Sequence, residues 1–173
     1  MEEAKILKDI IERRRSVFPK NYSSDDVSEE LINEVLAAAT FAPSHKRTKP
    51  WRFKVFKGVA KYNLGVELQN IYKTTTPEGH FLIKKYEDIG AKIDKTPVVI
   101  SIIVDFSGLV PEWEEIAATA MAVQNMYLTC TAHHIGCYWS SPKIVNQLTQ
   151  SLKLEENQQC LGLFYMGVPK GEE

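Results

Sequence analysis

The run PVVISIIV at 97–104 places the tightest limit on what this chain can fold into. It is β-branched at most positions, bounded by Pro97 and Asp105, and has no alternation between apolar and polar residues. Such a run is typical of a strand buried on both faces. It is far shorter than the roughly 20 residues that a membrane-spanning helix needs. The sequence therefore predicts a central strand with other elements packed on both sides.

The other expected elements follow from apolar spacing and from residues that start or stop helices. They are a helix over 4–15, a helix from Ser28 to Pro43, a strand over 52–56, a helix of about a dozen residues after Gly58, an irregular segment over 73–80, a long helix over 112–134, a short strand over 137–141, a helix with Ser141 as its N-cap and Pro142 first, and a strand over 160–166. This order predicts a single α+β domain over 1–173, with a sheet between helices and the helix over 112–134 placed centrally.

Composition narrows the class of protein. A net charge of −1 argues against a generic nucleic-acid binder, and no apolar run is long enough for a membrane span. The N-terminal residues MEEAKILKDIIERRR begin with acids and lack a secretory cleavage pattern. Three cysteines without framework spacing fit a reducing compartment. We therefore expect a cytoplasmic protein that acts on small molecules, without nucleic-acid or membrane partners.

The connection APSHKRTKPWRF at 42–53 is unusually cationic for a loop. His45, Lys46, Arg47 and Lys49 gather positive charge next to Trp51, which would destabilise a loop that meets no anion. The simpler interpretation is a polar surface loop in which the prolines act as stops. The functional interpretation is a group that binds a polar ring edge and stabilises negative charge on a reduced cofactor.

Two further segments carry candidate binding groups. Arg14, Arg15 and Ser16 close the first helix, where cations are favourable and are often merely solvated, or where they could capture a phosphate. The segment GCYWSSP at 136–142 has two serines before a proline. They are either a helix cap and its neighbour, or a source of free N–H groups for the polar edge of a ligand.

A metal site is the competing interpretation. Cys130, His133, His134 and Cys137 lie close in sequence, but the two histidines diverge on a helix and Cys137 follows its end. No second ligand pair with finger-like spacing is present in the sequence, so structural packing is favoured over a metal. The dinucleotide, P-loop and nucleophile-elbow signatures are absent as well.

The four segments RRS near residue 14, APSHKRTKPWRF, GCYWSSP and LGLFYMGVP, in this order, resemble the nitroreductase family of flavin oxidoreductases. The resemblance runs from about residue 4 to Pro169. It implies a three-layer α+β fold with a mostly antiparallel sheet and an interlocked homodimer, in which two FMN molecules are bound at the interface. It also implies that NADH or NADPH reduces the flavin, which then reduces a nitroaromatic, a quinone or a similar small electrophile.

The resemblance also assigns residues. Arg14, Arg15 and Ser16 would meet the FMN phosphate and ribityl chain; Pro43, Ser44 and His45 would come from the partner chain to the isoalloxazine; Trp139, Ser140 and Ser141 would contact the same cofactor. His45 is the candidate proton donor, on the grounds of its position and the pKa range of histidine.

This sequence departs from the family at several points. Arg47 and Lys49 stand where many members carry asparagine and glutamine, so flavin tuning or substrate preference should differ. Longer members continue with an arm that supplies a basic phosphate ligand; here the arginine cluster is expected to serve instead, with a lysine such as Lys92 or Lys95 as a candidate additional ligand. Two alternatives stay open: a flavin-binding storage or sensor protein without turnover, and a small metal-binding domain.

Overall fold

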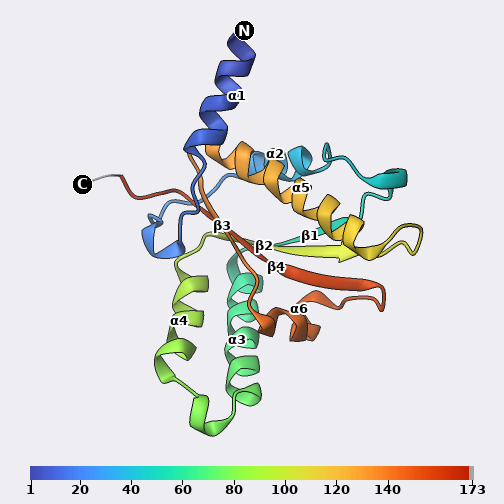
Figure 1. Ribbon diagram of the computed structural model, residues 1–173. Helices are drawn as coiled ribbons and strands as arrows, with labels where there is room; N and C mark the ends of the chain where they lie inside the picture. The colour runs from blue at the N-terminus through green and yellow to red at the C-terminus, as the bar shows by residue number, and fades with distance from the viewer. Residues whose placement is uncertain (172–173) are drawn as a thin grey trace.

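The computed structural model, which describes residues 1–171, contains a four-stranded antiparallel sheet with helices on both faces (Figure 1). The strands are β1 (Trp51–Phe56), β2 (Val98–Asp105), β3 (Gly136–Ser140) and β4 (Gln158–Gly167), in the order β1-β2-β4-β3. The expected α+β class and the antiparallel sheet are confirmed. The outermost strands are β1 and β3, so β3 has one edge that no other strand covers.

The helices form two layers around this sheet (Figure 1). They are α1 (Glu2–Arg13), α2 (Glu29–Ala39), α3 (Gly58–Thr75), α4 (Ile83–Asp94), α5 (Glu112–Ala132) and the short α6 (Thr149–Leu152). Helices α2 and α5 cover one face, whereas α3 and α4 lie on the other. Within residues 1–171, no helix is both long and apolar enough to cross a bilayer.

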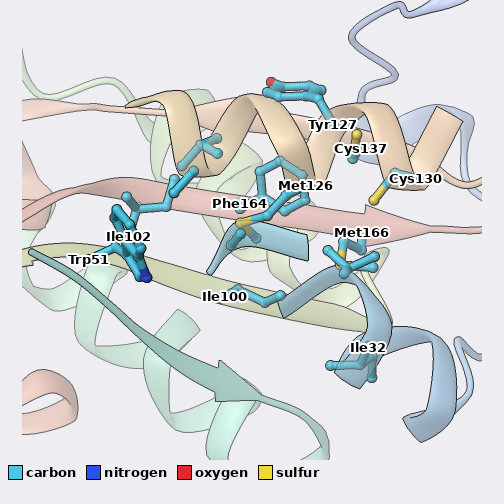
Figure 2. Packing of buried hydrophobic residues seen from close by; sticks show 14 of the residues in the cluster. Ile32, Trp51, Ile100, Ile102, Met126, Tyr127, Cys130, Cys137, Phe164 and Met166 are labelled. Carbon is cyan, nitrogen blue, oxygen red and sulfur yellow. The ribbon is translucent and has the colours of Figure 1, made fainter. Parts of the chain in front are cut away.

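Strand β2 is the centre of the fold, as the sequence predicts. Its side chains alternate between the two apolar clusters: Ile100 and Ile102 belong to the cluster beneath α5, and Val99 and Ile103 to the cluster beside α3. Because both faces are covered, nearly all of its side chains are apolar, and Ser101 is the buried polar exception. Figure 2 shows Ile100 and Ile102 packed beneath α5 together with Trp51, Met126 and Phe164.

Helix α5 lies across the sheet, which confirms its expected central position. Ala118 and Ala122 are fully buried on its inner side, and their small side chains let the helix backbone approach the strands closely. Farther along the helix, Met126 and Cys130 fill the space above Phe164 and Met166 (Figure 2).

Three predictions about secondary structure were wrong. Helix α3 continues through Thr75, so the irregular segment begins only after it. Helix α4 was missed, although Tyr86, Ile89 and Ile93 recur along one side, because their charged neighbours hide a weak apolar stripe. Ser141 is not an N-cap: Pro142 occupies that position, and the chain first forms a 3-10 turn over Lys143–Gln147.

Gly162 in β4 is required by a close approach of two strands. Its φ of 146° falls in the region that side chains avoid, and it borders a register shift between Ile102 and Ile103. A Cβ at this position would lie 2.4 Å from Trp139 Nε1 and 2.5 Å from the Ser140 carbonyl oxygen. The glycine therefore sets how closely β3 and its tryptophan lie against β4.

Replacing Gly162 by alanine should lower the free energy of unfolding by roughly 2–4 kcal/mol, because the substitution adds both backbone strain and overpacking. Urea denaturation followed by circular dichroism measures the change. Gly79→Ala is the matched control, since nothing lies within 4 Å of a Cβ there. If Gly162→Ala and Gly79→Ala have equal free energies of unfolding, the close contact between β3 and β4 at Gly162 does not contribute to stability.

Candidate functional site

The free edge of β3 is the feature around which the predicted binding residues gather. Two backbone groups on this edge bond to atoms outside the sheet: the Cys137 carbonyl accepts from the Val17 N–H at 2.9 Å, and the Trp139 N–H donates to Tyr127 Oη at 2.7 Å. Because outward-facing groups alternate along an antiparallel strand, position 141 follows in the same phase. The outward backbone groups named here at Cys137 and Trp139 are therefore bonded within the chain, and Ser141 is the next position that faces outward.

Arg14 lies above this edge at the end of α1. It leaves the helical conformation, is half-buried, and holds its guanidinium carbon 5.4 Å from the centre of the Tyr127 ring. Within residues 1–171, its guanidinium donates no hydrogen bond. Arg15 differs, because its side chain turns back to the carbonyl oxygens of Glu12 and Arg14 at 2.7 and 2.9 Å. Arg14 is therefore free to bind an anion, whereas Arg15 is engaged.

Tyr127 links the arginine to the edge strand. Burial raises the pKa of its hydroxyl, while the Trp139 N–H, the Ser16 hydroxyl and the charge of Arg14 act in the opposite direction. At the pH of a cell, the phenol is therefore a neutral bridge. Arg14, Ser16 and Trp139 are brought together around it.

Lys92 of α4 approaches the same strand from the opposite face of the sheet. Its Nζ donates to Ser140 Oγ at 3.0 Å and lies 4.5 Å from the ring centres of both Tyr138 and Tyr165. Burial lowers the pKa of Lys92 to about 8, because the charged ammonium loses hydration that the two rings replace only in part. Lys95, the other lysine considered from sequence, is exposed just past the end of α4.

A cavity of about 410 Å³ opens beside Lys92. Its walls are mostly apolar and its charged groups are three lysines; it is lined by Leu68, Tyr72, Lys85, Ile89, Lys92, Ser140, Pro142, Lys143, Ile144, Leu163 and Tyr165. A flat, partly polar molecule placed along the end of β3 would meet both the backbone edge and this cationic cavity.

The cationic loop lies at the opposite end of α5. His45 Nδ1 is 2.5 Å from Glu114 Oε2, and Lys46 Nζ donates to the Leu109 carbonyl oxygen at 2.9 Å. Lys46, Arg47 and Lys49 adopt positive φ angles of 50°, 56° and 45°. Such strain in residues other than glycine concentrates at functional segments. The loop is therefore built in one defined conformation.

Within one chain, the two groups of predicted residues do not meet. Glu114, which holds His45, and Tyr127, which holds Arg14, lie near opposite ends of α5. A rise of about 1.5 Å per residue separates them by roughly 20 Å along the helix. Pro43, Ser44 and His45 are thus remote from Arg14, Ser16 and Trp139 unless a second chain supplies one of the groups.

The cysteine–histidine cluster does not converge. Cys130 and Cys137 are buried on the sheet side of α5 (Figure 2), whereas exposed His133 turns outward and places Nε2 2.8 Å from Glu34 Oε1. A hydrogen bond with the Cys137 thiol, together with burial, raises the pKa of the Cys130 thiol, which keeps it protonated. Among the described residues, no group of three side chains could hold a metal ion.

Sequence reasoning missed the residues that connect the site. Tyr127 and Glu114 both occur in the long helix expected from sequence, but no local motif marks them. Their roles depend on partners 12 and 69 positions away in the chain. Lys92 was noted only as a cation; its helix was missed, so its contact with Ser140 could not be foreseen.

Comparison with known proteins identifies the family. A model described as "Nitroreductase family" matches residues 11–168. A Bacillus subtilis protein named "Putative NAD(P)H nitroreductase YfhC" is 26% identical over 168 residues, which cover 95% of this chain and 84% of that protein. A solved nitroreductase-like family protein from Bacillus cereus superposes with a TM-score of 0.81 at 25% identity, covering 96% of this chain and 89% of that one. NfnB from Mycobacterium smegmatis, solved in complex with NADPH, shares the fold with a TM-score of 0.78 at 19% identity, covering the same shares.

In the free protein, the Lys92 ammonium should titrate near pH 8 and be mostly neutral above that pH, because burial favours its uncharged form. An NMR titration of chains with ¹³Cε-labelled lysine measures this, and Lys92→Met identifies the resonance by its loss. A midpoint near 10.5, the ordinary value for lysine, would show that the amine is fully hydrated.

Proposed function

This chain belongs to the nitroreductase family, and from that premise we propose that it is an FMN-dependent oxidoreductase. It takes electrons from NADH or NADPH and passes them to a small electrophile such as a nitroaromatic or a quinone. The observation that carries the proposal is the half-buried Arg14 guanidinium, which lies beside the free edge of β3 without an acceptor among residues 1–171. We assign the protein to the cytoplasm, where its three unpaired cysteines stay reduced.

The described residues fit FMN in two parts. Arg14 and the Ser16 hydroxyl offer charge-assisted donors to the phosphate, next to Tyr127. The end of β3 at Ser140 and Ser141 would offer backbone groups and a serine hydroxyl to the polar side of the isoalloxazine, while Trp139, whose N–H donates to Tyr127, would contact the cofactor through its side chain. We reassign Arg15 from phosphate ligand to helix-end support, because its Nη1 binds the carbonyl oxygens of Glu12 and Arg14 and turns the side chain back toward α1.

We further propose that two chains form a homodimer in which each supplies the loop at Pro43, Ser44 and His45 to the other chain's cofactor. Two observations support it. The loop lies at the wrong end of α5 to serve its own chain. An apolar surface is also left exposed on α1 and on the outer side of α5, comprising Ile6, Leu7, Ile11, Trp113, Ile116 and Met121. In α1, no residue is buried at all, and the helix projects from the body of the molecule (Figure 1).

The chemistry of such a site is shared between cofactor and protein. When bound, FMN accepts a hydride from the nicotinamide and later returns it to the acceptor. Arg14 and Ser16 would hold the phosphate, and the end of β3 would orient the ring. Lys92, which lies on the other face of the sheet, would stabilise negative charge there. Arg47 and Lys49 would add positive charge from the loop of the second chain, which would favour an anionic reduced cofactor.

The direct test is the visible absorbance of the purified protein, recorded before and after anaerobic addition of NADH and then NADPH. A flavin spectrum that bleaches supports the proposal and identifies the preferred donor. A flavin spectrum that persists with both donors would indicate a storage or sensor protein. A colourless chain that takes up no added FMN would exclude both.

Arg14→Gln should weaken FMN binding by roughly 10- to 100-fold, because one charge-assisted contact with a phosphate contributes about 1.5–3 kcal/mol. Fluorescence titration of the flavin-free protein measures the Kd. Arg15→Gln is the matched control and should change the Kd less than threefold, since its side chain binds its own backbone. A larger loss for Arg15→Gln would reverse the assignment of the two arginines.

Ile116→Asp should convert the dimer to monomers and remove bound FMN, because it places a charge in the apolar face of α5. Analytical ultracentrifugation and the ratio of flavin to protein absorbance report the two effects. Tyr62→Asp is the control, because Tyr62 is exposed and lies on α3, on the other side of the sheet. The interface is assigned to the wrong face if Ile116→Asp remains dimeric.

A further inference from the structure

We propose that Glu114 is a positioning residue that fixes the ring of His45, so that His45 Nε2 gives a proton to the electron acceptor as it is reduced. This inference rests on the proposed function and assigns one part of its chemistry. It starts from the short contact of 2.5 Å between His45 Nδ1 and Glu114 Oε2. Glu114 is the more buried of the two, with 23% of its side chain exposed against 59% for His45. The Glu114 carboxylate is therefore held by its surroundings, and the His45 ring is the group exposed to a bound molecule.

The backbone that carries His45 is held at several points. The Ser44 hydroxyl accepts from the Lys49 N–H at 3.1 Å, and the Ser44 carbonyl accepts from the Arg47 N–H at 3.0 Å. Lys46 anchors the loop to the Leu109 carbonyl oxygen next to the start of α5. A ring on so constrained a loop keeps its direction, which is the requirement for a proton donor that must meet a bound molecule.

The contact also decides which ring nitrogen is free. A carboxylate only accepts hydrogen bonds, so Nδ1 must carry the hydrogen. Nε2 then points away from Glu114 and has no partner among residues 1–171. Among residues 1–171, Glu114 of α5 is the side chain that bonds to the imidazole, while Lys46, Arg47 and Lys49 are the cations of the same loop.

When bound, FMN would supply two electrons to the acceptor as a hydride. The acceptor would then need one proton to form a neutral product. In the proposed step, the Nε2–H bond of the imidazolium breaks and a new O–H bond forms on the acceptor. The ring is left neutral with its Nδ1–H still bonded to Glu114, and water returns the proton to Nε2. Uptake of FMN and its reduction by NAD(P)H would not require this pair.

The pairing is tested first without any turnover. In ¹⁵N-histidine-labelled protein above pH 8.5, the ring nitrogen shifts of His45 should report the Nδ1–H tautomer. Glu114→Ala should return the ring to the mixture dominated by Nε2–H, whereas Glu114→Gln, which keeps an acceptor, should retain the Nδ1–H form. Glu112→Ala is the control in the same helical turn. An unchanged tautomer in Glu114→Ala overturns the proposal.

The role in the reaction is tested by stopped flow on the FMN-loaded protein. Glu114→Ala should slow reoxidation of the flavin by a quinone roughly tenfold, a part of what a positioned acid contributes, and leave reduction by NAD(P)H unchanged. Glu114→Gln should restore part of that rate. If both half-reactions slow equally, Glu114 merely supports the fold and the proposal fails. If reduction by NAD(P)H is absent in the parent protein, the proposed function fails, while the tautomer result still stands on its own.

Discussion

The packing of α5 across the sheet is the interaction on which the rest of the structure depends. Buried Ala118 and Ala122 allow the helix to approach β2 and β4 closely, and the cluster beneath it fills one whole layer of the core. Both parts of the proposed site are attached to this helix. Glu114 near its start holds the cationic loop, and Tyr127 near its end holds Arg14 and the edge of β3. Because the helix is rigid and about 30 Å long, it keeps the two parts separate.

This separation is the main structural argument for the proposed dimer. A loop that is strained at three positions and tied to α5 is costly to maintain at a surface with no ligand. The apolar residues exposed on α1 and α5 are costly as well. In the proposed dimer, a second copy would relieve both costs at once, since it would cover the apolar surface and carry its loop to the neighbour's cofactor.

Much of the fold could be predicted from the sequence, because its main elements have strong local signals. The β-branched run at 97–104 predicts a buried strand, and the residues over 112–134 carry small and apolar side chains at helical spacing. Helix α4 could not be predicted in the same way, because Ile89 and Ile93 form a narrow stripe among charges and are fixed by packing against α3 and the sheet. Likewise, Ser141 and Pro142 suit the start of a helix locally, yet the chain forms a 3-10 turn there.

The candidate site, like the fold, could be predicted from the sequence only in part. The segments around Arg14, His45 and Ser140 could be located from sequence, because arginine pairs, cationic loops and serine–proline steps are visible locally. What each residue does depends on distant partners. Only the structure distinguishes the free Arg14 from the engaged Arg15, and only the structure places Lys92 beneath Ser140 and Glu114 against His45. Contacts between residues that are far apart in the chain cannot be recognised from a single sequence.

The central claim is that each cofactor site is built from two chains, and a mixed dimer tests it most directly. One chain would carry Arg14→Gln and the other His45→Ala, with different tags, and the doubly tagged dimer would be assayed for NAD(P)H-driven quinone reduction. If the loop serves the neighbouring chain, one of the two sites is intact, and the mixed dimer should recover about half of the parent rate, although each homodimer variant is nearly inactive. A mixed dimer as inactive as both homodimers would show that Arg14 and His45 serve the same chain, and would contradict the account.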